Sequence, residues 1–195
     1  AEAVQAYAEA VRALEKAVTL APERADVHAA LARAYLAADR IDEALAEADE
    51  SLKRDAKNVV ALNTAGSAYY YRGQLAQAAE YFDRAIKADP RYAQTYVNLG
   101  NTYFQMKSWY RAREAYRQAL ELLPTAKITT LALQRARIYY AIGLCYDQTL
   151  DYDNEIEALS EAIFLDDTLI DAYLQIARAY AARGEGEGKA GGYAI

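Results

Sequence analysis

Apolar and small side chains recur along this chain at spacings of three and four residues, which is typical of amphipathic helices. Leu99, Gly100 and Tyr103 form one such stripe. Pro90 and Pro124 close two of the helical stretches, because proline cannot continue a helix that precedes it. The pattern predicts an all-α protein built from short helices.

The same pattern returns after 34 residues, which is the length of a helix–turn–helix unit. Small residues such as Gly100 and Ala112 recur within it, and they allow the two helices of one unit to approach closely. The residues separated by this interval are Tyr35, Tyr69 and Tyr103; Ala44, Ala78 and Ala112; Gly66 and Gly100; and Pro90 and Pro124.

Eight positions of residues 59–92 and the same eight of residues 93–126 carry a pattern that resembles the tetratricopeptide repeat family. They are Leu62, Ala65, Gly66, Tyr69, Ala78, Phe82, Ala85 and Pro90, followed by Tyr96, Leu99, Gly100, Tyr103, Ala112, Tyr116, Ala119 and Pro124. The resemblance implies a right-handed superhelical solenoid of stacked antiparallel helix pairs, in which each repeat has a first helix A and a second helix B.

The repeat divides residues 1–183 into one solenoid that begins and ends in the middle of a repeat. The chain does not begin with methionine, and its first helix looks like the cut edge of a longer array. The expected parts are a lone second helix at 1–24; repeats at 25–58, 59–92, 93–126 and 136–169; a helix extension at 127–135; a terminal helix at 170–183; and a flexible tail at 184–195.

Nine residues, 127–135, interrupt the period, yet helical spacing continues through them. One long helix is therefore expected from about Thr125 to Gln148. The extension either packs on its own neighbour or offers an apolar flank to a partner or to a second copy. In the same repeat Glu155 stands where a small residue is usual, so looser packing is expected at that helix crossing.

The last twelve residues, 184–195, hold five of the nine glycines. Glycine is unfavourable in a helix interior, so these residues are expected to form a flexible tail.

The composition leaves little room for catalysis. The single Cys145 cannot form an internal disulfide, and together with the single His28 it cannot build a His/Cys metal cluster. His28 lies where the repeat carries a bulky core residue, so packing is its expected role. We therefore expect neither an enzyme nor a cofactor.

The net charge of −6 is spread so that both ends are acidic and the middle is mildly basic. A protein without a basic stripe is a poor candidate for binding nucleic acid. No apolar run is long enough to insert in a membrane. The compartment is not determined; the cytoplasm is favoured, and a removed targeting segment stays an alternative.

The resemblance further implies that the A helices line an inner groove. Amide side chains there offer donors and acceptors to an extended backbone, and aromatic side chains supply contact area. A protein-interaction scaffold or adaptor that binds a peptide or protein segment is the expected function. The alternative is a self-assembling structural module that uses the solenoid ends and residues 127–135. The candidate groove residues are Asn63, Ser67, Tyr70, Tyr71, Val97, Asn101, Phe104, Gln105, Arg137, Tyr140, Asp147 and Gln148.

Overall fold

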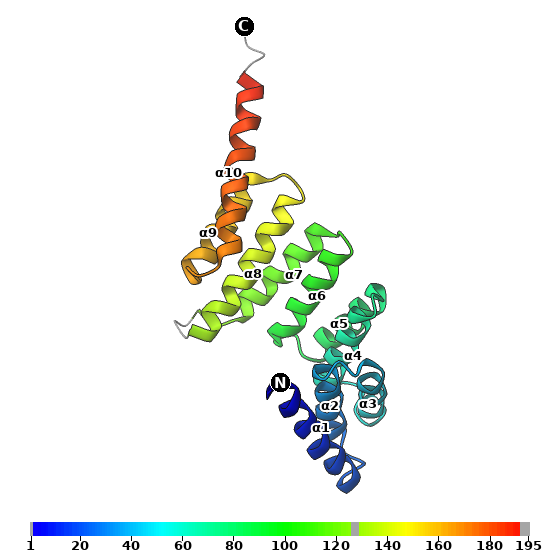
Figure 1. Ribbon diagram of the computed structural model, residues 1–195. Coiled ribbons are helices and arrows are strands. Elements are labelled where there is room, and N and C mark those ends of the chain that lie inside the picture. The colour runs from blue at the N-terminus through cyan, green and yellow to red at the C-terminus, as the bar shows by residue number, and fades with distance from the viewer. Residues whose placement is uncertain (1, 126–128, 192–195) are drawn as a thin grey trace. The chain divides into compact units, whose positions relative to one another are not determined.

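The computed structural model describes residues 2–125 and 129–191, and these residues form ten α-helices and no strand (Figure 1). Side chains are described for residues 5–125 and 130–184. The helices are α1 (Glu2–Leu20), α2 (Ala25–Ala37), α3 (Ile41–Arg54), α4 (Val59–Tyr71), α5 (Leu75–Ala88), α6 (Ala93–Gln105), α7 (Trp109–Leu122), α8 (Thr129–Asp147), α9 (Tyr152–Leu165) and α10 (Ile170–Gly191). The all-α fold expected from the sequence is confirmed.

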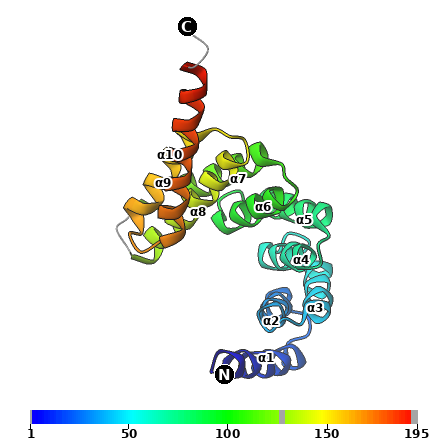
Figure 2. The same cartoon turned by 45° about the horizontal axis from the view of Figure 1, so that its top comes forward.

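The chain divides into two compact units, residues 1–102 and residues 103–195. In the first unit α2 packs on α3, α4 packs on α5, and α2 also contacts α4. In the second unit α8 packs on both α7 and α9, and α9 packs on α10, as the lower part of α10 shows in Figure 2. Apart from the contact of α2 with α4, these packed pairs are neighbours along the chain.

The turn between the two helices of each repeat contains one residue with a left-handed backbone. These residues are Asp39, Gly73, Lys107 and Leu150, with φ values of 60°, 73°, 58° and 56°. The first three are 34 positions apart, and the fourth follows after 43, which is the period plus the nine inserted residues. Only Gly73 takes this conformation without steric cost. The turns thus repeat in backbone geometry even where the sequence does not.

Small residues hold the paired helices close together at the centre of the first unit. Ala44 and Ala78 are fully buried, and Gly66 lies directly against the ring of Phe82. A Cβ atom built on Gly66 would stand 2.6 Å from Phe82 Cε1, which is shorter than any ordinary carbon contact. The close approach predicted from the small residues of the repeat is therefore present.

The corresponding crossing in the second unit is also tight, although looser packing was expected there. A Cβ atom on Gly143 would lie 2.8 Å from Leu159 Cδ2. Glu155 is buried beside them, and Gln175 donates a hydrogen bond to its Oε1 at 3.0 Å. The expectation of loose packing was wrong, because the helix contact uses Gly143 and Leu159 while Glu155 reaches a polar partner on α10.

Two element boundaries differ from the expectation. Helix α8 begins at Thr129 rather than near Thr125, because the backbone is extended at Leu123 after α7 and residues 124 and 125 are not helical. Residues 126–128, which belong to the expected extension, lie outside the described part of the chain. Arg135 donates hydrogen bonds to the carbonyl oxygens of Leu120 and Leu123 at 2.9 and 3.2 Å, so this part of the extension packs on the end of α7.

The second difference concerns the expected tail. Helix α10 does not end at residue 183 but continues to Gly191, so the prediction of a flexible tail was wrong for residues 184–191. Residues 192–195 are not described. Extending an existing helix needs no new nucleus and adds one hydrogen bond per residue, which offsets the unfavourable propensity of glycine.

Candidate functional site

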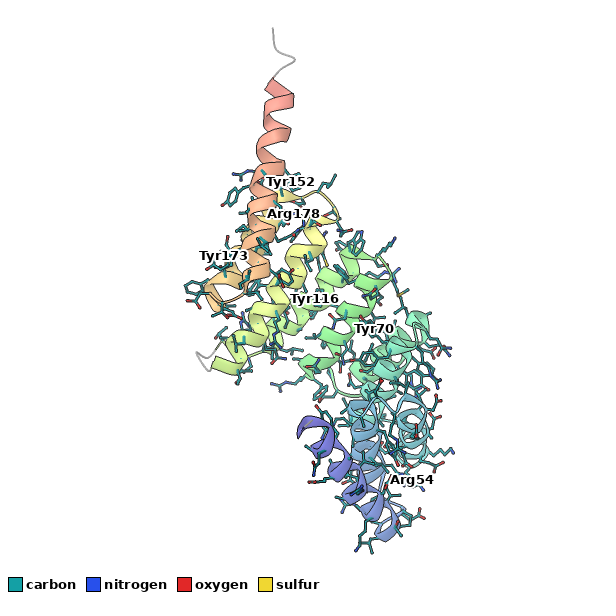
Figure 3. All side chains as sticks on the ribbon, in the orientation of Figure 1. Arg54, Tyr70, Tyr116, Tyr152, Tyr173 and Arg178 are labelled. Atoms are coloured by element: carbon teal, nitrogen blue, oxygen red, sulfur yellow. The ribbon has the colours of Figure 1, made fainter. Side chains whose placement is uncertain are left out.

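The candidate groove residues of the first unit lie on α4 and α6. Ser67, Tyr70 and Tyr71 share one face of α4 because they are three and four positions apart. Together with Asn98 and Asn101 of α6 they line a small hollow of about 60 Å³ (Tyr70 is labelled in Figure 3). The structure therefore brings four of the sequence-predicted residues together at one place.

The hollow is lined by polar but uncharged groups, with the buried ring of Phe82 behind them. Asn98 accepts a hydrogen bond from Gln94 at 2.9 Å. Hydroxyl and amide groups of this kind bind peptide N–H and C=O groups, whereas a charged tail would find no opposite charge in the lining. The arrangement favours a neutral, extended backbone as ligand.

Two aromatic side chains form the rim of this hollow. The rings of Tyr70 and Tyr71 meet edge to face with centroids 5.7 Å apart. Tyr70 is half-buried, while Tyr71 is 68% exposed. An exposed tyrosine held against a fixed neighbour offers contact area at a low cost in side-chain entropy.

Asn63 does not lie on this surface. It is only 7% exposed, and its Nδ2 donates to Val59 O at 3.0 Å and to Thr95 Oγ1 at 2.8 Å. The side chain thus links α4 to α6 inside the unit. Asn63 was predicted to face the groove, whereas its side chain is buried and its amide reaches Thr95 on the next A helix. Val97 is half-buried on α6 and does not line the hollow.

The other six candidates belong to the second unit. Phe104 packs edge to face on Trp109 with ring centroids 5.0 Å apart, and Gln105 is exposed. Arg137, Tyr140 and Asp147 follow one face of α8 at helical spacing. Arg137 is exposed, Tyr140 and Asp147 are half-buried, and the exposed Gln148 donates a hydrogen bond to Asp147 at 2.9 Å.

Tyr140 faces the start of α10. Burial raises the pKa of its hydroxyl, and the nearby carboxylate of Asp171 raises it further. The phenol is therefore neutral at physiological pH and acts as a hydrogen-bond donor rather than as an anion. That this face of α8 contacts a ligand stays a prediction.

Two residues that line the hollow were not among the candidates, Asn98 and Phe82. Asn98 is three positions before Asn101 and so shares its face of α6, a signal that the sequence already contained. Phe82 belongs to the second helix of the repeat, and its ring reaches the hollow only because Gly66 has no side chain. That contact could not be read from helical spacing alone.

The single histidine is packed inside the first unit and lies away from the candidate groove residues. His28 is 4% exposed, with Nδ1 2.7 Å from Glu47 Oε2 and Nε2 2.9 Å from Pro22 O, so packing and hydrogen bonding occupy it. No group of three His, Cys, Asp or Glu side chains among the described residues is placed to hold a metal ion. None of the described helices combines the length and apolarity that crossing a membrane requires.

Paired helices on a repeat of 34 residues, with equivalent turns and with Gly66 and Gly143 at equivalent close crossings, define an α-helical repeat protein. Models of the tetratricopeptide repeat match residues 2–65 and 91–167, and a model described as TPR repeat matches residues 66–107. The chain belongs to the tetratricopeptide repeat family. Proteins of this family generally mediate protein–protein interactions.

Curated relatives match over part of their length. General transcriptional corepressor trfA of Dictyostelium discoideum is 31% identical over 125 residues, which are 64% of this chain and 8% of that protein. DnaJ homolog subfamily C member 7 of Homo sapiens is 28% identical over 153 residues, which are 72% of this chain and 30% of that protein. The chain therefore spans less than a third of either relative.

A solved structure confirms the fold at low sequence identity. The crystal structure of YrrB, described as a TPR protein with an unusual peptide-binding site, superposes with a TM-score of 0.73. It is 20% identical and the match covers 90% of this chain and 86% of that one. At this identity the likeness shows the fold alone.

Proposed function

We propose that this chain is a protein-interaction scaffold, not an enzyme, and that the α4–α6 face of its first unit binds an uncharged, extended segment of a partner protein. The observation that carries the proposal is the hollow lined by Ser67, Tyr70, Tyr71, Asn98 and Asn101, in which every lining group is neutral. Its small volume fits a single small side chain, so most of the ligand would lie along the rim.

The energetics of the rim support a peptide ligand. A ligand that covers Tyr71 and the exposed part of Tyr70 removes aromatic surface from water, which contributes about 25 cal/mol of binding free energy per Å² of apolar area. The amides of Asn98 and Asn101 then supply donors and acceptors to the ligand backbone. YrrB, with the same fold, is described as having a peptide-binding site, which makes a peptide ligand a reasonable proposal for this chain too.

The test is binding of the immobilised protein to an array of 12-residue peptides that are either neutral or highly charged. We expect the strongest signals from neutral peptides, and we expect Tyr71→Ala combined with Asn101→Ser to reduce them at least tenfold. Tyr110→Ala is the matched control, because Tyr110 is 70% exposed and lies on α7 in the other unit. Equal loss in the control, or no loss in the double variant, would refute the proposal.

A further inference from the structure

The second unit contains a separate groove on which none of the candidate residues lies. It is formed by α7, α8 and α9 and has a volume of about 480 Å³. Its floor is apolar and aromatic, with the half-buried Leu120 and Tyr139 beside the buried Ile142. This is much more room than the α4–α6 hollow offers, and it is enough for several side chains of a ligand.

Three acidic side chains and one arginine, Arg117, line this groove. Glu121 comes from α7, and Glu157 and Glu161 come from the facing α9. All three are exposed, and none of them forms an ion pair with another described residue. Glu157 and Glu161 are one helical turn apart, so their like charges repel each other. A cationic ligand would relieve that repulsion.

Arg117, which lines the groove, and the neighbouring Arg113 are both engaged with partners inside the unit. Arg117 donates to the hydroxyl of Tyr146 at 2.6 Å. The guanidinium of Arg113 lies over the Tyr146 ring at 4.4 Å and donates to Thr149 Oγ1 at 3.3 Å. Both side chains are thus directed at Tyr146, and the three carboxylates are left to face solvent.

The spacing of the carboxylates decides which cation fits. A divalent metal ion requires several oxygen ligands within about 2.6 Å of one point, and no described group of acidic residues is placed to hold a metal ion. A ligand with several separate positive charges is suited to carboxylates spread over two helices. Lysine or arginine side chains on one segment provide such charges, and an apolar residue between them would cover the floor.

We propose that the groove between α7, α8 and α9 binds a basic, amphipathic segment of a partner protein. Its lysine or arginine side chains pair with Glu121, Glu157 and Glu161, and its apolar side chains contact Leu120, Tyr139 and Ile142. This surface is independent of the α4–α6 face, since it lies in the other unit and selects a ligand of different charge. One chain would then hold two segments of different chemistry.

The test uses a rhodamine-labelled peptide in which lysine alternates with leucine, and follows its fluorescence polarisation at low salt. We expect Glu157→Gln combined with Glu161→Gln to weaken binding at least tenfold. The control variant, Glu23→Gln combined with Glu80→Gln, removes the same charge in the first unit and should bind like the native protein. All four positions are exposed, and circular dichroism checks that both variants fold.

Three results would overturn the proposal. One is unchanged binding by the α9 double variant, and another is an equal loss in the control variant, which would indicate attraction to net charge only. The third is full displacement of the peptide by millimolar Ca²⁺ at constant ionic strength, which would indicate a metal site. A peptide with glutamate in place of lysine should not bind. Tyr71→Ala should leave this binding unchanged, so failure here and failure of the α4–α6 proposal are distinguishable.

Discussion

Replacing Gly66 by alanine tests the close helix crossing on which the first unit depends. The added Cβ atom would stand 2.6, 2.8 and 2.9 Å from three atoms of the Phe82 ring, whereas ordinary contacts begin near 3.4 Å. Phe82 is 1% exposed and the only space described beside its ring is the hollow of about 60 Å³, so the ring can move little to relieve the contact. Overpacking of this kind costs about 1–3 kcal/mol.

A second effect of the same substitution acts in the opposite direction. Alanine is better than glycine in a helix interior by about 1 kcal/mol. We therefore expect Gly66→Ala to lower the free energy of unfolding by about 0–2 kcal/mol, which is the overpacking cost less the gain in helix propensity. The measurement is urea denaturation followed by circular dichroism at 222 nm.

A matched control separates the two effects. Gly184 also lies inside a helix, and a Cβ atom built there meets nothing within 4 Å. Gly184→Ala should therefore show only the gain in helix propensity, up to about 1 kcal/mol. If Gly66→Ala stabilises the protein as much as this control does, the close approach to Phe82 is absent.

A double-mutant cycle gives the sharper test. Phe82→Leu removes the outer ring atoms, and alone it leaves a cavity, while the alanine methyl group at position 66 fills part of that space. The two substitutions should be less destabilising together than their sum, with a coupling of about 1 kcal/mol or more. Strict additivity would refute the packing argument.

Three further predictions follow from buried polar groups. Burial holds the pKa of the Glu155 carboxyl above its usual range, so the folded chain keeps a proton that the unfolded chain has released. The stability that this group contributes is present below the usual carboxyl pKa and is lost as the pH rises through the pKa of the folded state. Glu155→Gln should therefore flatten the pH dependence of the Tm. Parallel curves of Tm against pH for the two proteins would contradict this. Thr95→Val removes the acceptor for the Asn63 amide and should cost about 1–3 kcal/mol in urea denaturation. Thr102→Val, which removes only a bond within one helix, should cost less. Burial raises the pKa of the Cys145 thiol to about 12, so a thiol reagent at pH 8 should modify the unfolded protein and leave the native protein intact.

The sequence predicted the fold well because the same helical pattern recurs several times along the chain. Gly66, Gly100 and Gly143 occupy equivalent positions of the repeat, and the prediction of paired helices follows from their spacing and from the prolines that end two repeats. The interval of 43 positions between the Lys107 and Leu150 turns likewise agrees with the nine inserted residues. Repetition thus makes a weak local signal reliable.

The site was predicted less completely, because periodicity places a residue on a face but does not say what covers that face. Ser67 and Asn101, which were predicted as groove residues, line the hollow, whereas Asn63 turns inward to reach Thr95 on the next A helix. The groove between α7 and α9 also escaped prediction, since its walls come from two B helices. Which side chains form such a surface depends on how the helices pack on one another, and a single sequence does not show that packing.

Within each unit, the packing of helices on their neighbours along the chain also has a consequence for the folding pathway. No pair such as α2 with α3 or α8 with α9 has to close a long loop before it gains contacts, and the entropy cost of closure is small for short loops. Proteins dominated by local contacts fold on the order of microseconds to milliseconds. Folding can begin at any helix pair and spread to the next, so an early intermediate would already contain one complete pair.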